Sequence, residues 1–377
     1  MNNARRLRFY AFFVFFACVC SFPSGAQQRR QDPWWITLEE GKRYFRSGAY
    51  GDALRFFENA RENRKKYYAG MERELITVLS IYEVRRLKDD LSLLEAYIEK
   101  EFRTVAKDAL NELYYRVPKE NLQNSSSAAL SELQRLKNYP EAEYWIGEVY
   151  RMEGEFSIAL VQYKKAYNDR ALLEHPEFGT EILYKIADLH KLRREYSEMT
   201  IILEEILKAD TLWSRESFNR SNMQRSLEKN GINRFLLLFR HNEPSMEKAH
   251  RTLGFYYYSN GARHERAAEH LLFAFLIQNS VIIEALLRSE YDYTFDELPS
   301  LMKAIAGRRD LLAYVNETEY YRTLYYLANS LYGVNRRLPA REIWTFLRDF
   351  AGGEWQERAA SQLRNPQLDP IPPNRGL

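Results

Sequence analysis

Two twenty-residue stretches of this 377-residue chain share one pattern: Gly41–Ala60, GKRYFRSGAYGDALRFFENA, and Gly147–Ala166, GEVYRMEGEFSIALVQYKKA. Seven small or aromatic positions recur at a constant offset of 106, and each difference between the copies exchanges one aromatic residue for another. They are Gly41, Tyr44, Gly48, Tyr50, Ala53, Phe57 and Ala60, then Gly147, Tyr150, Gly154, Phe156, Ala159, Tyr163 and Ala166. A small residue and an aromatic three positions later share a helical face. The pattern predicts two antiparallel helices joined by a glycine turn, with the four alanines buried between them.

Weaker copies follow along the chain. At offsets of 146 and 287 the helical periodicity persists, but Arg194 and Asn335 replace the turn glycine. A copy that begins at Gly254 needs one inserted residue. A fixed period indicates an array of similar units, which we expect near 34–66, 140–172, 180–209, 247–279 and 321–350. Degenerate units fill the gaps, and Ile76–Phe102, with a break at residues 88–90, fits one.

The run from Tyr44 to Ala60, Tyr-x-x-x-Gly-x-Tyr-x-x-Ala-x-x-x-Phe-x-x-Ala, resembles the signature of tetratricopeptide repeats. Trp34 and Trp35 precede it, where that family carries an aromatic, but Lys65 stands where the family often has proline. The resemblance implies a right-handed α-solenoid of helix pairs whose first helices line a concave groove that binds peptides or proteins. A helical bundle with coincident spacing is the alternative.

Composition favours an all-α chain. The 377 residues include only 16 glycines and 12 prolines, and four of the prolines lie among the last twelve positions. No sustained alternation of apolar and polar residues indicates a strand. We therefore expect helical hairpins from 34 to 364, ending in a capping helix near 354–363, because repeat arrays must cover their last apolar face.

The N-terminus has the features of an export signal. Three arginines precede the apolar run Phe9–Phe22, and small residues lead to a predicted cleavage after Ala26. The run is short for a membrane span, which needs about 20 apolar residues. The mature chain is expected to begin at Gln27 in the periplasm or outside the cell. A lipoprotein anchored at Cys18 is the alternative, because Phe15–Cys18 loosely resembles a lipobox.

Removal of residues 1–26 changes the chemistry available to the chain. Cys18 and Cys20 are the only cysteines, so the mature chain has no disulfide and no thiolate metal site. It retains 52 basic and 52 acidic residues, and this neutral balance argues against a nucleic-acid partner. We interpret basic runs such as Arg64–Lys66 as solvated helix faces, with anion binding as the alternative.

Three stretches interrupt the helical pattern. Residues 121–128, NLQNSSSA, predict a polar loop that ends in a helix cap. The apolar run Phe235–Phe239 is either a buried helix or a docking helix for a partner. The tail, Asn365–Leu377, NPQLDPIPPNRGL, is proline-punctuated and is predicted to be disordered or extended.

Motifs for catalysis, cofactors and metals are missing from the sequence. The six histidines include no pair at the spacing of a helical metal motif, and His190 occupies an aromatic core position of its unit. The chain lacks a phosphate loop, a nucleophile elbow and a dinucleotide fingerprint. We expect a protein that is not an enzyme and binds no cofactor or metal.

The candidate binding residues follow from the resemblance. In tetratricopeptide repeats the groove is lined by first-helix residues three before, one after and four after the small position. Applied to Gly147, Ala187, Gly254 and Ala328, this rule selects Tyr144, Glu148, Arg151, Tyr184, Asp188, Lys191, Arg251, Phe255, Tyr258, Tyr325, Asn329 and Tyr332. Their mixture of aromatic and charged side chains suits a peptide. The alternative is a solvated inner face, or packing against a degenerate unit.

The function expected from these features is a scaffold outside the cytoplasm that binds protein or peptide partners through the groove. A second hypothesis is a structural subunit of a large cell-envelope assembly, by analogy with tetratricopeptide scaffolds such as those of spirochaete periplasmic flagellar collars. A third is a lipoprotein partner of a solute transporter, with a small molecule in a pocket.

Overall fold

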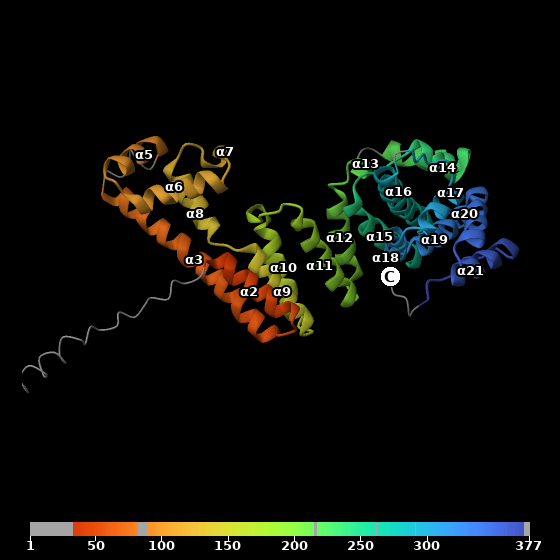
Figure 1. Ribbon diagram of the computed structural model, residues 1–377, viewed down its shortest axis with the longest axis horizontal. Coiled ribbons are helices and arrows are strands. Elements are labelled where there is room, and N and C mark those ends of the chain that lie inside the picture. The colour runs from red at the N-terminus through yellow and green to blue at the C-terminus, as the bar shows by residue number, and fades with distance from the viewer. Residues whose placement is uncertain (1–32, 82–88, 215–216, 261–262, 291, 373–377) are drawn as a thin grey trace, which may run out of the picture. The chain divides into compact units, whose positions relative to one another are not determined.

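The computed structural model describes residues 33–81, 89–214, 217–260, 263–290 and 292–372 (Figure 1). In these ranges the secondary structure is helical, without a strand, which confirms the all-α expectation. The predicted export signal, which includes Cys18, lies outside the described residues. The chain divides into two compact units, one ending at Pro176 and the other beginning at Glu177, where the sequence led us to expect one continuous array.

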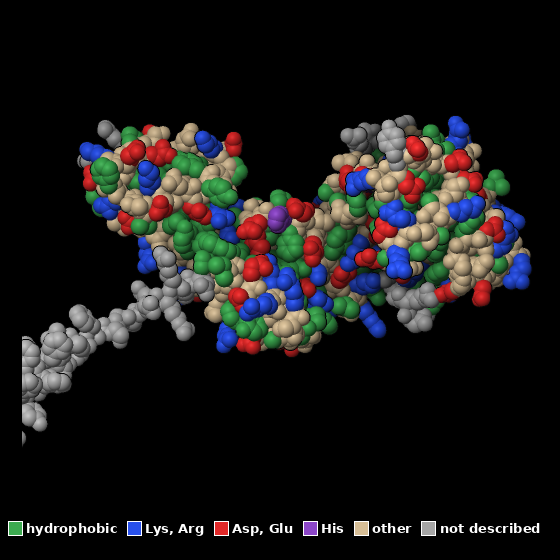
Figure 2. Space-filling model, in the orientation of Figure 1, with side chains coloured by type: hydrophobic (Ala, Val, Ile, Leu, Met, Phe, Trp, Pro, Cys, Tyr) green, Lys and Arg blue, Asp and Glu red, His purple; other side chains and the backbone are tan. Residues whose placement is uncertain are grey.

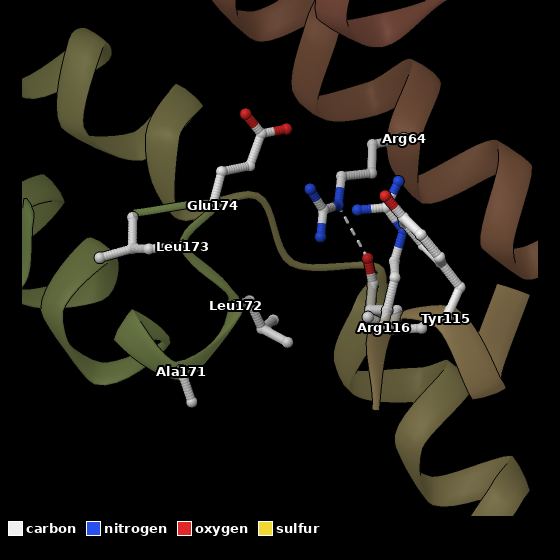
Figure 3. A pocket seen from close by; sticks show the side chains of 8 residues that line it. Arg64, Tyr115, Arg116, Ala171, Leu172, Leu173 and Glu174 are labelled. Atoms are coloured by element: carbon white, nitrogen blue, oxygen red, sulfur yellow. Dashed lines mark hydrogen bonds between the residues drawn. The ribbon is translucent and has the colours of Figure 1, made fainter. Parts of the chain in front are cut away.

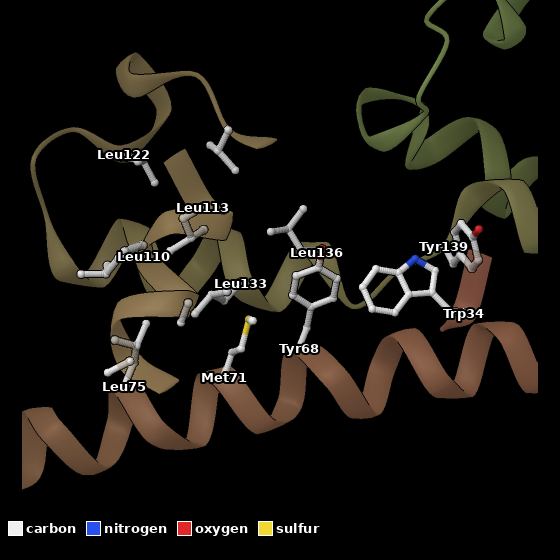
Figure 4. Close-up of a cluster of buried hydrophobic side chains, with 14 of the residues drawn as sticks. Trp34, Tyr68, Met71, Leu75, Leu110, Leu113, Leu122, Leu133, Leu136 and Tyr139 are labelled. Atoms are coloured by element: carbon white, nitrogen blue, oxygen red, sulfur yellow. The ribbon is translucent and has the colours of Figure 1, made fainter. Parts of the chain in front are cut away.

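The N-terminal unit is built around one long helix, α3 (Tyr50–Ile81), which α2 (Trp34–Arg46), α6, α8 and α9 contact along its length. Its other elements are α5 (Leu91–Lys100), α6 (Thr104–Arg116), α7 (Lys119–Leu122), α8 (Ser126–Leu136), α9 (Pro140–Met152), α10 (Phe156–Asn168) and η1 (Arg170–Leu172). Figure 4 shows Tyr68, Met71 and Leu75 of α3 facing leucines of α6, α7 and α8. Burial of this apolar surface holds the shorter helices on α3.

The stretch Ile76–Phe102, expected to form one degenerate unit, is helical from Ile76 to Ile81 and from Leu91 to Lys100. Ile76–Ile81 are the end of α3, which continues through position 65 because no proline stops it there. A new helix does begin at the predicted break, because the Asp90 side chain accepts hydrogen bonds from the N–H groups of Ser92 and Leu93 as the N-cap of α5. That helix packs against α6.

The polar stretch 121–128 divides into two parts. Asn121 and Leu122 complete the short helix α7, and Gln123 and Asn124 have positive φ angles of 48° and 53°. The Ser125 side chain then accepts a hydrogen bond from the N–H of Ser127 and caps α8, so the predicted helix cap is confirmed.

The paired helices meet as the repeated pattern predicts. Ala53, Ala60, Ala159 and Ala166 are fully buried. A Cβ atom added to Gly41 would lie 2.5 Å from Cε1 of Phe57, so only glycine allows α2 to approach α3 this closely.

The turns between four helix pairs share one backbone conformation. In each turn one residue has a positive φ: 79° at Gly48, 82° at Gly154, 61° at Arg194 and 62° at Asn335. The next N–H group then donates to the carbonyl five residues back, in the pairs Ala49–Tyr44, Glu155–Tyr150, Glu195–His190 and Arg336–Leu331, at 2.8 to 3.0 Å. This is the hydrogen bond of a Schellman motif. The turn therefore persists where the sequence has lost its glycine.

The C-terminal unit is a succession of contacting helices. Its elements are α11 (Phe178–Leu192), α12 (Tyr196–Leu207), α13 (Thr211–Ser214), α14 (Ser217–Leu238), η2 (Pro244–Met246), α15 (Glu247–Ser259), α16 (His264–Ser289), α17 (Leu298–Ala306), α18 (Arg309–Glu317), α19 (Tyr320–Gly333), α20 (Arg337–Phe350) and α21 (Gly353–Arg364). Among the described helices, α16 alone has the length and apolar composition of a membrane span, and most of its apolar stretch is buried against α15 and α19, as in a core helix. 

The apolar run at the end of α14 is only half buried. Phe235 and Leu236 are fully buried, whereas Leu237 and Leu238 are 51% and 56% exposed. Phe235 and Leu236 therefore fit a buried helix, whereas Leu237 and Leu238 fit a surface that could dock a partner. On the face seen in Figure 2, basic and acidic side chains are interspersed, in keeping with the similar numbers of basic (55) and acidic (52) residues in the chain.

Candidate functional site

The described part of the tail, Asn365–Pro372, lies beside the C-terminal unit (Figure 1) and accepts hydrogen bonds from its side chains. After α21 it runs without helix or strand and is held by side chains of α15, α19 and α21. The sequence predicted a disordered or extended tail, and the described part is extended, with contacts that were not predicted. Contact is possible because proline-rich backbone, which lacks many N–H donors, leaves its carbonyl groups free to accept hydrogen bonds.

Asp369 is the most strongly held tail residue. The Tyr258 hydroxyl donates to its backbone carbonyl at 2.7 Å, and the Tyr325 hydroxyl donates to its carboxylate at 2.7 Å. Arg358 Nη1 lies 3.3 Å from the same carboxylate oxygen. Three donors from three helices therefore converge on this one residue.

Further contacts continue along the tail. The Tyr326 hydroxyl donates to the carbonyl of Pro370 at 3.3 Å, and that of Tyr332 donates to the carbonyl of Pro366 at 3.4 Å. In the reverse direction, the N–H of Gln367 donates to Gln362 Oε1 at 2.8 Å. We call the contacting side chains the tail-binding surface: Tyr258, Tyr325, Tyr326, Tyr332, Arg358 and Gln362.

Three of the tyrosine hydroxyls also accept a hydrogen bond from a neighbouring side chain, which orients them. Tyr258 accepts from Asn329 Nδ2 at 3.4 Å, Tyr325 from Gln362 Nε2 at 3.0 Å and Tyr326 from Arg358 at 3.3 Å. A hydroxyl has only one proton to donate, so these contacts direct that proton toward the tail. Asn329 is itself fixed, because Trp344 Nε1 donates to its side-chain oxygen at 3.2 Å.

Aromatic packing supports this surface. The Trp355 ring lies 5.4 Å from that of Tyr325, and Tyr326 contacts the rings of both Tyr258 and Phe255. Burial raises the pKa of Tyr258, Tyr325 and Tyr326, so their hydroxyls remain protonated donors at neutral pH.

Four of the twelve residues selected from the sequence meet at this site. Tyr258, Tyr325 and Tyr332 contact the tail, and Asn329 orients Tyr258. Phe255 is buried beneath Tyr326, with the Arg322 guanidinium 4.3 Å from its ring centroid. 

The selected residues of the N-terminal unit serve packing. Tyr144 and Glu148 are buried in α9. Glu148 pairs with Arg151 at 2.9 Å and accepts a hydrogen bond from the Tyr163 hydroxyl of α10. This polar group joins the two helices of one pair, whereas the alternative named from the sequence was packing against a degenerate unit.

The remaining selected residues join helices of the C-terminal unit. The Tyr184 hydroxyl donates to the carbonyl of Ser245, and Asp188 pairs with Lys248 at 2.7 Å. Arg251 lies between Glu247, at 2.8 Å, and Glu319, at 2.6 Å. Lys191 is half-buried, and burial lowers the pKa of its ammonium group.

The contribution of α21 to the tail-binding surface was not predicted from the sequence. This helix was expected only to cap the array, yet Arg358 and Gln362 lie one turn apart on its face toward the tail. The available signal was their spacing of four, which places two hydrogen-bonding side chains on one helical face.

A buried histidine cluster was also missed, because its members are distant in sequence. Asp210 contacts Nε2 of His241 at 2.9 Å and Nε2 of His250 at 3.1 Å, and Nδ1 of His250 lies 3.1 Å from Nδ1 of His270. Burial lowers the pKa of His250 and of His270. Burial also acts to raise the pKa of Asp210, but hydrogen bonds from His241, His250 and the N–H of Trp213 hold it well below its usual range.

The contacts of this cluster connect α13 to the helices around it. Asp210 also accepts from the N–H groups of Leu212 and Trp213, so it caps α13. The Trp213 ring packs on His250, His270 and Phe273. In the described part of the chain, no group of three or more His, Cys, Asp or Glu side chains is arranged to hold a metal ion.

The N-terminal unit contains a separate pocket of about 640 Å³ between α3, the ends of α6 and α8, and residues 171–174 (Figure 3). Arg64 lines it and is buried, so the expectation of a solvated face is wrong at this position. Its Nε donates to the carbonyl of Leu136 at 2.9 Å, and its guanidinium lies 4.7 Å from the Tyr139 ring centroid. With Leu172 on the facing wall, the pocket offers a cation beside apolar surface.

Comparison with known proteins connects this chain to two bacterial relatives. It is 28% identical over 340 residues to an uncharacterized protein of Treponema pallidum (strain Nichols), a match that spans 89% of this chain and 90% of the relative. It is 22% identical over 273 residues to an uncharacterized protein of Borreliella burgdorferi (strain ATCC 35210 / DSM 4680 / CIP 102532 / B31), spanning 66% of this chain and 84% of the relative. No family model matches the chain.

Proposed function

We propose that this protein is an exported, non-catalytic scaffold of the tetratricopeptide type that binds a peptide segment of a partner protein on the tail-binding surface. The observation that carries the proposal is the contact with the tail itself. Four tyrosine hydroxyls from α15 and α19 donate to the backbone or side chain of a segment without regular secondary structure. A surface that holds one such segment has the chemistry to hold another.

The tetratricopeptide type is supported by two features. The glycine–aromatic contact recurs in two helix pairs, and the same turn hydrogen bond recurs in four. In that family, helix pairs present residues of their first helices to a partner. Here α15 and α19, the first helices of two pairs, provide all four tyrosines of the tail-binding surface.

Export is proposed from the N-terminal sequence. Three arginines, an apolar run and small residues before Gln27 support cleavage after Ala26. The intact mass of the native protein tests this: we expect a chain that begins at Gln27 with no lipid. A chain that begins at Cys18 with added acyl mass would favour the lipoprotein alternative.

Capture of partners from an envelope extract of the source bacterium tests the binding function. The bait is the mature chain ending at Arg364, which exposes the tail-binding surface. Its matched control carries Tyr258→Phe, Tyr325→Phe and Tyr326→Phe, which remove three donor hydroxyls and keep the packed rings. We expect the control to lose at least ten-fold of the captured partner. Equal capture by the two equally folded baits would contradict the proposal.

A second candidate is a structural subunit of a cell-envelope assembly. Two observations favour it: both relatives come from spirochaetes, and Leu237 and Leu238 are exposed at the end of α14. Leu237→Ser and Leu238→Ser together would then remove the protein from the assembly, as measured by its co-sedimentation with envelope complexes, while the triple tyrosine variant would remain.

The third candidate, a solute-binding partner of a transporter, rests on the pocket beside Arg64. A guanidinium next to leucine side chains suits a small carboxylate. Isothermal titration with short carboxylic acids would show binding that Leu172→Trp abolishes by filling the pocket.

A further inference from the structure

We propose that the tail is a built-in competitor for the tail-binding surface, and that the partner segment it excludes is an extended, proline-containing peptide with an aspartate directly before a proline. This inference rests on the proposed function, because it assumes that the surface also binds a partner. It adds the chemical class of the partner and a way in which binding is regulated.

The direction of the hydrogen bonds identifies the ligand class. Five of the six contacting side chains act as donors to the tail, and their acceptors are the carbonyls of Pro366, Asp369 and Pro370 and the carboxylate of Asp369. A segment with several prolines presents carbonyl groups without competing N–H groups. Recognition of such segments on aromatic surfaces is a known mode of peptide binding.

Asp369 provides the specificity. Its carboxylate receives the Tyr325 hydroxyl and lies beside the Arg358 guanidinium, while its carbonyl receives the Tyr258 hydroxyl. Pro370 follows, and its carbonyl is the next acceptor. An aspartate–proline pair therefore offers three acceptors, the aspartate carboxylate and the carbonyl groups of both residues. Each of them lies opposite a side-chain donor of the tail-binding surface. Leu368, by contrast, is 48% exposed and contributes little to recognition.

The tail is bound in a way that permits its release. Gln367, Leu368 and Pro370 are exposed, so the tail is held by polar contacts at the surface of the unit. It is also attached directly to α21, and a short connection of this kind gives an effective concentration on the order of 1 mM. A tail that binds at about 10 µM as a free peptide would then weaken a competing peptide roughly 100-fold.

Fluorescence anisotropy with a labelled peptide of the sequence NPQLDPIPPNRGL tests this inference. Three proteins are compared: the mature full chain, the same chain with Asp369→Ala, and the chain ending at Arg364. The full-length Asp369→Ala variant releases the tail without truncation, so a folding defect caused by truncation does not decide the result. Circular dichroism confirms that all three are equally helical.

We expect the shortened chain and the Asp369→Ala chain to bind the peptide at least ten-fold more tightly than the full chain. A peptide with Ala in place of the aspartate should lose at least ten-fold in affinity, whereas replacement of the leucine before it should change little. Equal affinity of the three proteins for the peptide, or tail exchange that produces dimers in light scattering, would overturn the inference.

Failure of the inference is distinguishable from failure of the proposed function. Partner capture that depends on the three tyrosine hydroxyls, without binding of the tail peptide, refutes the competitor and leaves the binding function. Tight binding of the tail peptide, without any captured partner, refutes the binding function and leaves only the contact between the tail and the surface.

Discussion

The ring of Tyr163 lies directly against the backbone of Gly147: a Cβ atom added to Gly147 would be 2.8 Å from both Cδ1 and Cε1 of that ring. Gly41 and Phe57 repeat the relationship 106 residues earlier. Each pair connects the first helix of a hairpin to the second. The shared pattern in the sequence is therefore a shared contact in space, and this contact sets how closely the two helices approach.

Gly147→Ala is expected to destabilise the N-terminal unit by about 1–3 kcal/mol, because the added methyl group overpacks the contact with Tyr163. Gly41→Ala should behave alike. The matched control is Gly70→Ala in α3, where an added Cβ meets no atom within 4 Å and the change should stabilise by up to about 1 kcal/mol. Urea unfolding followed by circular dichroism measures all three. A neutral Gly147→Ala would disprove the close approach.

The left-handed turn residues give a second prediction. Arg194→Gly and Asn335→Gly should each stabilise the C-terminal unit by roughly 0.5–1 kcal/mol, because glycine adopts a positive φ without steric cost. Gly154→Ala should destabilise the N-terminal unit by about 1 kcal/mol for the same reason. Thermal unfolding measures both. If Arg194→Gly lowers stability while Gly154→Ala is neutral, the shared turn conformation is contradicted.

These turns show which parts of the fold could be predicted from the sequence. Helix pairs and their turns depend on neighbours within about 20 residues. The local sequences Gly41–Ala60 and Gly147–Ala166 were therefore sufficient to predict their helix pairs. At Arg194 and Asn335 the sequence indicated that the turn was absent, because a sequence gives the residue type and not its φ angle. The division of the chain into two units after Pro176 could not be predicted from the sequence, since it depends on contacts between helices far apart in the chain.

Asn329 is expected to be a structural residue that positions Tyr258. Asn329→Ala removes the acceptor of Trp344 Nε1 and the donor to the Tyr258 hydroxyl, and should cost roughly 1–3 kcal/mol. A double-mutant cycle with Trp344→Phe should give a coupling energy of about 0.5 kcal/mol or more. The exposed Asn316→Ala in α18 is the control. Additive effects of the two changes would refute the contact.

The buried histidine cluster predicts a loss of stability in mild acid. Since burial lowers the pKa of His250 and His270, they remain neutral when folded but take up protons when unfolded below about pH 6.5. Unfolding free energy should therefore fall as pH drops from 7 toward 5, by up to about 1.4 kcal/mol per pH unit for each histidine. The lowered pKa of Asp210 adds a further loss below about pH 4.

The measurement is the urea midpoint at pH 7.5, 6.0 and 5.0. His270→Phe keeps a ring against Tyr257 and removes one titrating group, so it should reduce the slope by about half. His175→Gln, at an exposed position of the N-terminal unit, serves as the control. An unchanged slope in His270→Phe would show that the cluster does not cause the acid sensitivity.

The tail-binding surface could be predicted from the sequence only in part. Tyr258, Tyr325 and Tyr332 were selected from their places on first helices, and α15 and α19 do bring them together. The same rule selected Tyr144 and Tyr184, which are used in packing, because position on a helix does not reveal what covers it. The return of the tail joins residues 111 positions apart, Tyr258 and Asp369, and no local pattern records such a contact.

Photocrosslinking from the tail can show whether Asn365–Pro372 lie on the tail-binding surface in solution. A benzoyl-phenylalanine in place of Ile371, next to Pro370, is irradiated in a mixture of ¹⁴N- and ¹⁵N-labelled full-length chains, and the products are mapped by mass spectrometry. Leu338, which is 80% exposed on α20, is the control position. We expect crosslinks from Ile371 to α15, α19 or α21 within one chain, and fewer of them in the triple tyrosine variant. Crosslinks that join different chains, or that avoid these three helices, would contradict this placement of the tail.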